Sequence, residues 1–258
     1  MSPSRTVSRS TDFLSRTSRF FLFSLTHVYL YGEREVYDMY IRYIGHSCFS
    51  LEGSKKVLID PMPAEAAEIA ADLVLVTHGH GDHLGITVDL KKPTVAIHEL
   101  AHYLLRKGVP ATGMNLGGTL VSDGVKVTMV PALHSSSVTE NGIELYMGTA
   151  AGFMVEMDGI VVYHAGDTAL FSDMKLIHDL YHPDVALLPV GDHYTMGPAE
   201  AMIAAEWIGA PLVIPMHYNT FPAIVQDLTE FKHAIEATTS MLVDVVTPGD
   251  GVEVVPQT

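Results

Sequence analysis

The feature that most constrains this chain is a loop that carries four potential metal ligands directly after an apolar run. Residues 73–76 are apolar without interruption, which is typical of a strand buried on both faces, and they lead into Thr77-His78-Gly79-His80-Gly81-Asp82-His83-Leu84-Gly85. Glycine permits positive φ angles and a tight path, so the loop can curl and direct several side chains at one point. Imidazole and carboxylate ligands suit zinc, manganese, iron or nickel, whereas calcium and magnesium sites are almost entirely oxygen. A single histidine here would more simply cap the strand through hydrogen bonds, but a packed group predicts a metal site.

The composition indicates a folded protein that does not bind nucleic acid. Hydrophobic residues make up 48% and charged residues 17% of the 258 residues, which is enough for one sizeable domain with a buried core. The net charge of −15 argues against the basic patches that neutralise phosphates in nucleic-acid-binding proteins. Cys48 is the only cysteine and lies in an apolar run. We therefore expect Cys48 in the core, no intrachain disulfide, and a cytoplasmic protein.

The first 38 residues differ from the rest. Residues 1–19 are rich in Ser and Thr and contain several arginines, and an apolar stretch follows at 20–31. This order resembles a secretory signal or a transit peptide, but the apolar stretch is shorter than the roughly 20 residues of a transmembrane helix. The alternative is that Met39 is the true start, because a regular strand pattern begins at Tyr40. We favour that alternative, and predict an extension at 1–38, one domain at 39–258 and no membrane segment.

Beyond Met39, short strand-like runs alternate with turns and a few helices. Asp158-Gly159 joins two such runs and is the strongest hairpin signal in the chain. Strand meanders and helices occur twice, which fits an α+β protein with two sheets packed face to face and helices outside. We expect strands at 40–44, 48–51, 56–59, 73–76, 125–130, 152–157, 160–163, 185–190, 212–214, 241–246 and 252–255, and helices at 63–71, 99–107, 173–181, 198–209 and 223–238.

The His-x-His-x-Asp-His loop resembles the hallmark of the metallo-β-lactamase superfamily, and the other hallmarks of that superfamily follow in order. Each of them lies where a predicted strand gives way to a loop. The resemblance spans the chain from about Met39 to the C-terminus and implies a four-layer αββα sandwich. The residues that carry it are Asp60 after 56–59, His134 after 125–130, Asp167 in Tyr163-His164-Ala165-Gly166-Asp167-Thr168, and His217 in Ile214-Pro215-Met216-His217-Tyr218.

The resemblance also implies a role for each of these residues. Asp60 would orient a ligand through hydrogen bonds. Asp167 would lie between two metal ions, and Asp82 and Asp167 would be catalytic as well as metal-binding. The cysteine that one class of β-lactamases uses as a metal ligand has no counterpart here, so antibiotic hydrolysis is not expected. The remaining ligands would be divided between the ions, the first taking His78, His80 and His134 and the second taking Asp82, His83 and His217.

A closer resemblance is to the UPF0173 metal-dependent hydrolases, relatives of the ascorbate-6-phosphate lactonase branch. It rests on Gly45-His46-Ser47-Cys48-Phe49 and on Gly191-Asp192-His193-Tyr194-Thr195-Met196-Gly197-Pro198. The sequence leaves open whether His46 reaches the metal site or is a turn histidine. We expect His193 and Tyr194 to line the substrate pocket, because they follow the buried strand at 185–190. His164 is expected to point away from Asp167. The other histidines are expected to be surface residues or helix caps: His98, His102, His178, His182 and His233.

These features predict a hydrolase that carries two divalent metal ions, which can be zinc, manganese, nickel or iron. Two such ions can share a water molecule and lower its pKa, so that metal-bound hydroxide attacks a small ester, lactone, amide or phosphodiester. An iron-dependent redox protein and a non-catalytic metal-binding protein remain alternatives with the same ligands. The expected partner is a small-molecule substrate, with a possible homo-oligomer. The sequence does not identify the substrate or the metal.

Overall fold

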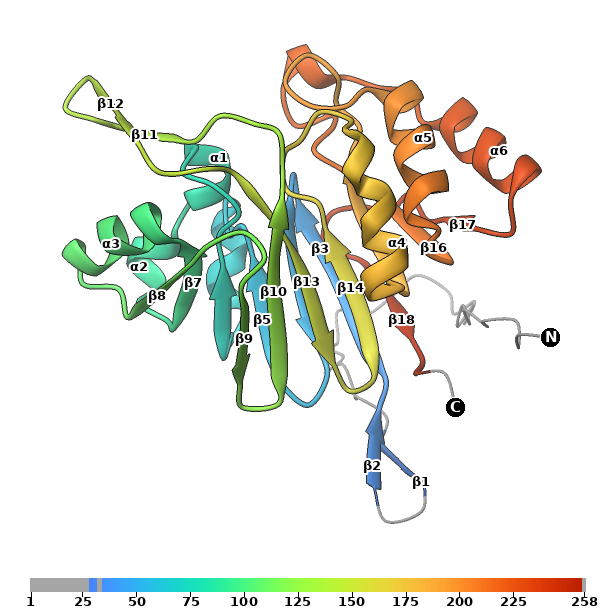
Figure 1. Cartoon of the computed structure of the whole chain (residues 1–258), viewed down its shortest axis with the longest axis horizontal. Coiled ribbons are helices and arrows are strands. Elements are labelled where there is room, and N and C mark those ends of the chain that lie inside the picture. Colours follow the sequence, from blue (N-terminus) through green and yellow to red (C-terminus); the bar gives the residue numbers. More distant parts are fainter. Residues whose placement is uncertain (1–27, 32–33, 257–258) are drawn as a thin grey trace, which may run out of the picture.

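The computed structural model describes residues 28–31 and 34–256, and in it two mixed seven-stranded sheets pack face to face (Figure 1). One group of helices lies beside the first sheet. The outer face of the second is covered by α4 (Lys175–Tyr181), α5 (Pro198–Ile208) and α6 (Thr229–Thr238). The predicted α+β sandwich is confirmed. Among the described helices, none has the length and apolarity needed to cross a membrane.

The first sheet has the strand order β18-β3-β4-β5-β6-β7-β8. Its first three strands in the chain form the predicted antiparallel meander, and the next three add in parallel. The strands are β3 (Met39–Gly45), β4 (Cys48–Glu52), β5 (Lys56–Ile59), β6 (Leu73–Leu75), β7 (Thr94–Ile97), β8 (Ala111–Met114) and β18 (Gly251–Val254), and the helical segments among them are η1 (Ala64–Glu68), α1 (Gly81–Leu84), α2 (Thr87–Leu90) and α3 (His98–Arg106).

The second sheet has the strand order β17-β16-β15-β14-β13-β10-β9. Asp158 and Gly159 both have positive φ angles, 57° and 80°, and form the predicted tight turn between β13 and β14. The strands are β9 (Thr119–Ser122), β10 (Val125–Pro131), β13 (Ala151–Met157), β14 (Ile160–His164), β15 (Val185–Pro189), β16 (Leu212–Met216) and β17 (Leu242–Val243), and the helical segments are η2 (Ser172–Met174), α4 (Lys175–Tyr181), α5 (Pro198–Ile208), η3 (Pro222–Ile224) and α6 (Thr229–Thr238).

Strand β15 illustrates how the layers form from the sequence. All five of its residues are buried, as its unbroken apolar run predicts. Val185 and Leu187 belong to the core between the two sheets, whereas Ala186 and Leu188 belong to the core under the outer helices. Successive side chains of a strand point to opposite faces, so one apolar run serves both cores.

Two hairpins lie outside the main sheets. One joins β1 (Val28–Tyr31) and β2 (Arg34–Tyr37), and the other joins β11 (Ser137–Glu140) and β12 (Ile143–Tyr146). In Figure 1 the first projects from the end of the sandwich near β18 and the second extends beyond α1. Residues 1–27 lie outside the described residues, so the predicted extension at 1–38 and the single domain at 39–258 remain predictions.

Several predicted boundaries are wrong, and local hydrogen bonds explain the largest error. The helix expected at 223–238 is instead a short turn, η3, followed by α6. Between them, the Asn219 side chain accepts a hydrogen bond from the backbone N–H of Gln226, and Asp227 accepts from the backbone and hydroxyl of Thr229. Side chains of this kind favour turns and helix starts over helix interiors. The helix expected at 63–71 is only η1, and the strand expected at 241–246 is only β17.

Candidate metal centre

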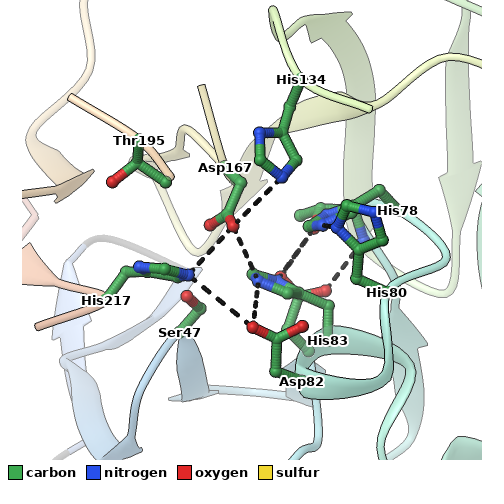
Figure 2. A network of polar contacts seen from close by, with 12 residues as sticks. Ser47, His78, His80, Asp82, His83, His134, Asp167, Thr195 and His217 are labelled. Carbon is green, nitrogen blue, oxygen red and sulfur yellow. Dashed lines mark hydrogen bonds and ion pairs between the residues drawn. The ribbon is translucent and has the colours of Figure 1, made fainter. Parts of the chain in front are cut away.

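The predicted ligands come together at one edge of the sandwich, where strands of both sheets end. Asp60 follows β5, and the loop from His78 to His83 follows β6, both in the first sheet. From the second sheet, each of three strands supplies one residue just beyond its carboxyl end. These are His134 after β10, Asp167 after β14 and His217 after β16, and Figure 2 shows them facing the loop of the first sheet.

The ligand loop uses the positive φ angles that glycine permits only at its last glycine, Gly85. Gly79 and Gly81 are not among the glycines with positive φ; of the loop, only Gly85 is, with φ 43°. Gly79 is instead required for space, because a Cβ there would lie 2.9 Å from Cβ of Met147. Gly81 has open space around it and begins α1, which places Asp82 and His83 in a first helical turn.

One group of donors consists of His78, His80 and His134. Each offers a ring nitrogen, and these three atoms lie within 4.8 Å of one another. Nε2 of His78 is 2.9 Å from Nδ1 of His80. Burial lowers the pKa of all three imidazoles, most strongly that of His78. Neutral imidazole is the form that binds a metal ion, so this group is prepared for one.

A second group of donors contains Asp82, His83 and His217, together with His46. One atom from each of these four residues lies within 4.8 Å of the others. Asp167 stands between the two groups: its Oδ2 is 3.2 Å from Nε2 of His83, 3.0 Å from Nε2 of His217 and 3.6 Å from Nε2 of His134. The Asp167 carboxylate thus lies within reach of donors from both groups.

The second group is strongly charged. Burial would raise the pKa of Asp167, but the neighbouring His83 and His217 lower it by more, and it lies well below its ordinary value. Conversely, burial lowers the pKa of His217, while the Asp167 and Asp82 carboxylates, 3.0 and 3.8 Å from its Nε2, raise it by more, to about 9. The pKa of His83 is also raised, because the Asp167 and Asp60 carboxylates outweigh its burial. In the metal-free protein, the positive charges of the protonated His83 and His217 imidazoles therefore offset the negative charges of the carboxylates, as a bound cation would.

Unsatisfied buried atoms support the same interpretation. Among the described residues, Nε2 of His83 and Oδ1 of Asp167 are buried without a hydrogen-bond partner, since the 3.2 Å approach of His83 to Oδ2 of Asp167 lacks hydrogen-bonding geometry. A buried polar atom left unpaired costs about 1–3 kcal/mol. Coordination to a divalent ion would satisfy both atoms, and a mixed set of nitrogen and carboxylate donors suits a transition metal. The residues present fit metal binding.

Asp60 holds His83 in the orientation that such binding requires. Its carboxylate lies 2.7 Å from Nδ1 of His83 and accepts hydrogen bonds from the backbone N–H and the hydroxyl of Thr77, both at 2.8 Å. With Nδ1 engaged, Nε2 of His83 is directed at Asp167. A carboxylate that fixes the ring and tautomer of a ligand histidine is a common support of metal sites.

The centre opens into a cavity of about 640 Å³. Tyr194 lines this cavity, whereas His193 is outside its lining and packs against the Tyr194 ring at a centroid distance of 4.4 Å. No sequence pattern pointed to four other residues that line the cavity, Ser135, Phe221, Pro222 and Ala223. Their position depends on how the loops after β10 and β16 fold back over the metal centre.

The other histidines and Cys48 have structural surroundings. Cys48 is fully buried in the core between the sheets. Nδ1 of His164 accepts a hydrogen bond from the Gly166 N–H, so its Nε2–H donates to the carbonyl oxygen of Ser47 and joins the two sheets. This cross-sheet role was not predicted. The remaining histidines that the structure describes are all exposed: His98, His102, His178, His182 and His233.

Comparisons with known proteins agree with this arrangement. A model of the beta-lactamase superfamily domain matches residues 40–217. A UPF0173 metal-dependent hydrolase of Methanoculleus marisnigri is 60% identical over 220 residues, which are 85% of this chain and 98% of that protein. One of Methanosarcina barkeri is 47% identical over 224 residues, covering 83% and 97%. Among solved structures, Igni18, a metallo hydrolase of Ignicoccus hospitalis, shares 36% identity and a TM-score of 0.76, covering 84% of this chain and 98% of its own. The chain therefore belongs to the metallo-β-lactamase superfamily and, within it, to the UPF0173 metal-dependent hydrolases.

Proposed function

We propose that this protein hydrolyses a small ester, lactone, amide or phosphodiester at a centre of two divalent metal ions. The observation that carries the proposal is the position of Asp167, whose Oδ2 approaches both histidine groups while the residue lines the cavity. A carboxylate shared in this way suits a pair of ions better than a single one. Zinc, manganese, nickel and iron all remain suitable for the donor set.

The chain's own residues have three roles in this reaction: they bind the ions, orient a ligand and line the cavity. When bound, two divalent ions supply an acidified water as nucleophile and positive charge for the oxyanion that develops in the transition state. Asp82 and Asp167 would hold the ions, and both face the cavity, which is the sense in which we regard them as catalytic. Asp60 keeps His83 oriented. Tyr194 and Phe221 line the cavity and offer aromatic surface to a substrate.

The cavity suits a small molecule without a strong negative charge. Its lining is aromatic and apolar on the side of Tyr194, Phe221 and Pro222, and the described residues that line it include no Lys or Arg. The protein also has a net charge of −15, which repels polyanions at a distance. We therefore favour an uncharged ester or lactone, or a singly charged phosphodiester, over a phosphate monoester. We further propose a cytoplasmic protein, which fits its single buried cysteine, and a homo-oligomer, which sedimentation analysis would test.

The direct test is a substrate panel assayed with defined metals. Protein purified without added metal would be analysed for its metal content, stripped with a chelator, and reloaded with Mn²⁺, Zn²⁺ or Ni²⁺. We expect turnover of neutral nitrophenyl esters, lactones or bis(4-nitrophenyl) phosphate that disappears on chelation and returns with metal. Failure of every reloaded form on every substrate class would favour a non-catalytic metal-binding protein. Bound iron with a visible absorption band and no hydrolysis would favour a redox protein.

The matched variant for this test is Asp167→Asn. It keeps the shape of the side chain but removes the charge that two ions would share, so we expect activity to fall by at least about a hundredfold. The metal content should fall from two equivalents towards one. Activity near that of the wild type would contradict the dinuclear mechanism.

A further inference from the structure

His46 lies beside the second donor group, but the ligand pattern of the superfamily gives it no role. It occupies the tight turn between β3 and β4 with a left-handed backbone, φ 57°, and its side chain is fully buried. Its carbonyl oxygen accepts hydrogen bonds from the Tyr43 hydroxyl at 3.1 Å and from the backbone N–H of His217 at 2.8 Å. A non-glycine residue held in this conformation by contacts from both sheets often belongs to a functional site.

The ring of His46 is fixed as firmly as its backbone. It packs against the rings of His217 and Phe221, at centroid distances of 4.1 and 5.4 Å. Its Nδ1 lies 3.1 Å from the hydroxyl oxygen of Thr220, and its Nε2 lies 3.1 Å from Oδ2 of Asp82. The ring therefore spans the distance between the loop after β16 and the ligand loop after β6.

The Thr220 hydroxyl can fix the tautomer of His46 in one of two ways, and the first follows from its contact with Tyr218. The single hydroxyl proton of Thr220 is donated to the carbonyl oxygen of Tyr218, at 3.3 Å. The hydroxyl oxygen is then an acceptor, so Nδ1–H of His46 donates to it. In a neutral imidazole the other nitrogen, Nε2, must then present a lone pair. This lone pair faces the Asp82 carboxylate at 3.1 Å, which is repulsive unless a cation lies between them.

We propose that His46 is a direct metal ligand and joins Asp82, His83 and His217 around one ion. The inference rests on the metal centre of the proposed function, but not on its substrate. It agrees with the spacing of the four donor atoms, all within 4.8 Å of one another. It also gives His46 the arrangement usual for a ligand histidine, whose second nitrogen donates to an oxygen. The competing arrangement turns the Thr220 proton to Nδ1, so that Nε2–H donates to Asp82 and His46 only positions that carboxylate.

Cobalt-loaded protein distinguishes these arrangements without any substrate. Each coordinated histidine whose second nitrogen is protonated gives one exchangeable, paramagnetically shifted N–H resonance. The variant is His46→Asn, because Asn adopts left-handed backbone readily and its side chain is too short to replace the imidazole. We expect the loss of one such resonance, a changed visible absorption spectrum, and an affinity for one of the two ions reduced more than the 10–100-fold typical of outer hydrogen-bond partners. Thermal unfolding of the metal-free variant would verify that it folds.

Thr220 provides the matched controls. Thr220→Val keeps the shape but removes the acceptor of Nδ1–H, so the visible spectrum should stay that of the wild type while affinity falls about tenfold. Thr220→Ser should retain wild-type affinity. If His46→Asn kept every shifted resonance and the wild-type spectrum, His46 would not be a ligand and the inference would be overturned. If the resonance is lost in His46→Asn but the metal-loaded wild-type protein hydrolyses no substrate, only the proposed function is contradicted.

Discussion

At the scale of single residues, three positions of the metal centre have backbone conformations that most side chains avoid. His46, Asp60 and His217 all have positive φ angles, between 48° and 57°. Each follows directly on a strand or lies in a tight turn between strands, so the backbone must change direction at once to aim the side chain inward. Such conformations cost of order 1–3 kcal/mol each and persist only where the surroundings enforce them. Here the surrounding hydrogen bonds of Asp60 and His46 do so.

The charge on His217 predicts how metal binding depends on pH. Its pKa in the metal-free protein is raised to about 9. The pairing of charged His217 with Asp167 and Asp82 therefore stabilises the folded metal-free protein fully below about pH 6.5, and this stabilisation is lost as the pH rises through about 9. A metal ion at Nε2 must displace this proton. Between pH 6.5 and 9, metal uptake should therefore release the His217 proton, and affinity should increase with pH.

Calorimetric titration with metal, in buffers of different ionisation enthalpy, would count the released protons. We expect about one proton fewer at pH 9.5 or above than at pH 7.5. His134 is not expected to contribute at pH 7.5, because burial lowers its pKa and its imidazole is already neutral there. A proton count and an affinity that stay constant over this interval would contradict the assignment of a charged His217.

At the scale of elements, strand ends could be predicted well because their signal is local. An apolar run that stops at a polar residue marks a strand that leaves the core. The superfamily resemblance then picked out Asp60, His134, Asp167 and His217, which follow β5, β10, β14 and β16. The loop glycines could not be interpreted in the same way. Gly79 is needed because the base of the β11–β12 hairpin, through Met147 and Ser137, lies against it. Those residues are distant in sequence, so no local pattern revealed the contact.

The two loop glycines therefore make a matched pair of variants. In Gly79→Ala, the new Cβ would lie 2.9 Å from Met147 and 3.0 Å from the carbonyl oxygen of Ser137, so the loop or the hairpin must shift. We expect a loss of about 1–3 kcal/mol of unfolding free energy and weaker metal binding. Gly81→Ala places its Cβ in open space at the start of α1 and should change stability by no more than about 1 kcal/mol, in the stabilising direction. Urea unfolding of both metal-free variants tests this, and equal effects would contradict the steric explanation.

At the scale of the whole molecule, the metal centre connects the two sheets. The ligand loop belongs to the first sheet, and His134, Asp167 and His217 belong to the second. Around the centre, hydrogen bonds also cross between the layers, among them those from His164 to Ser47 and from the backbone N–H of His217 to the carbonyl oxygen of His46. Metal ions bound here would hold the halves of the sandwich together. Because the assembled donors exist only in the folded chain, metal binding should also stabilise the fold.

Removal of the metal should therefore lower the melting temperature. A ligand present at a thousand times its dissociation constant stabilises the folded state by about 4 kcal/mol per site. We expect a chelator to lower the melting temperature of the wild type and metal to restore it, as measured by calorimetry or circular dichroism. Asp167→Asn should show a smaller shift between the metal-free and metal-loaded forms. Identical melting of loaded and stripped wild-type protein would mean that the ions do not join the two halves.

The sequence by itself determined the α+β sandwich and drew attention to the residues at its metal centre, because hydrophobic period and ligand chemistry are properties of neighbouring residues. It did not determine what His46 does, why Gly79 has no room for a side chain, or which loop residues after β10 and β16 line the cavity. Those answers depend on contacts such as His46 with Asp82, 36 residues away, and with Thr220, 174 residues away. Only the packing of the two sheets brings such residues together, since the free energy that positions them is shared by the whole core. The ligand types could thus be predicted from the chain, whereas the tertiary structure alone decided how they are arranged around a shared carboxylate.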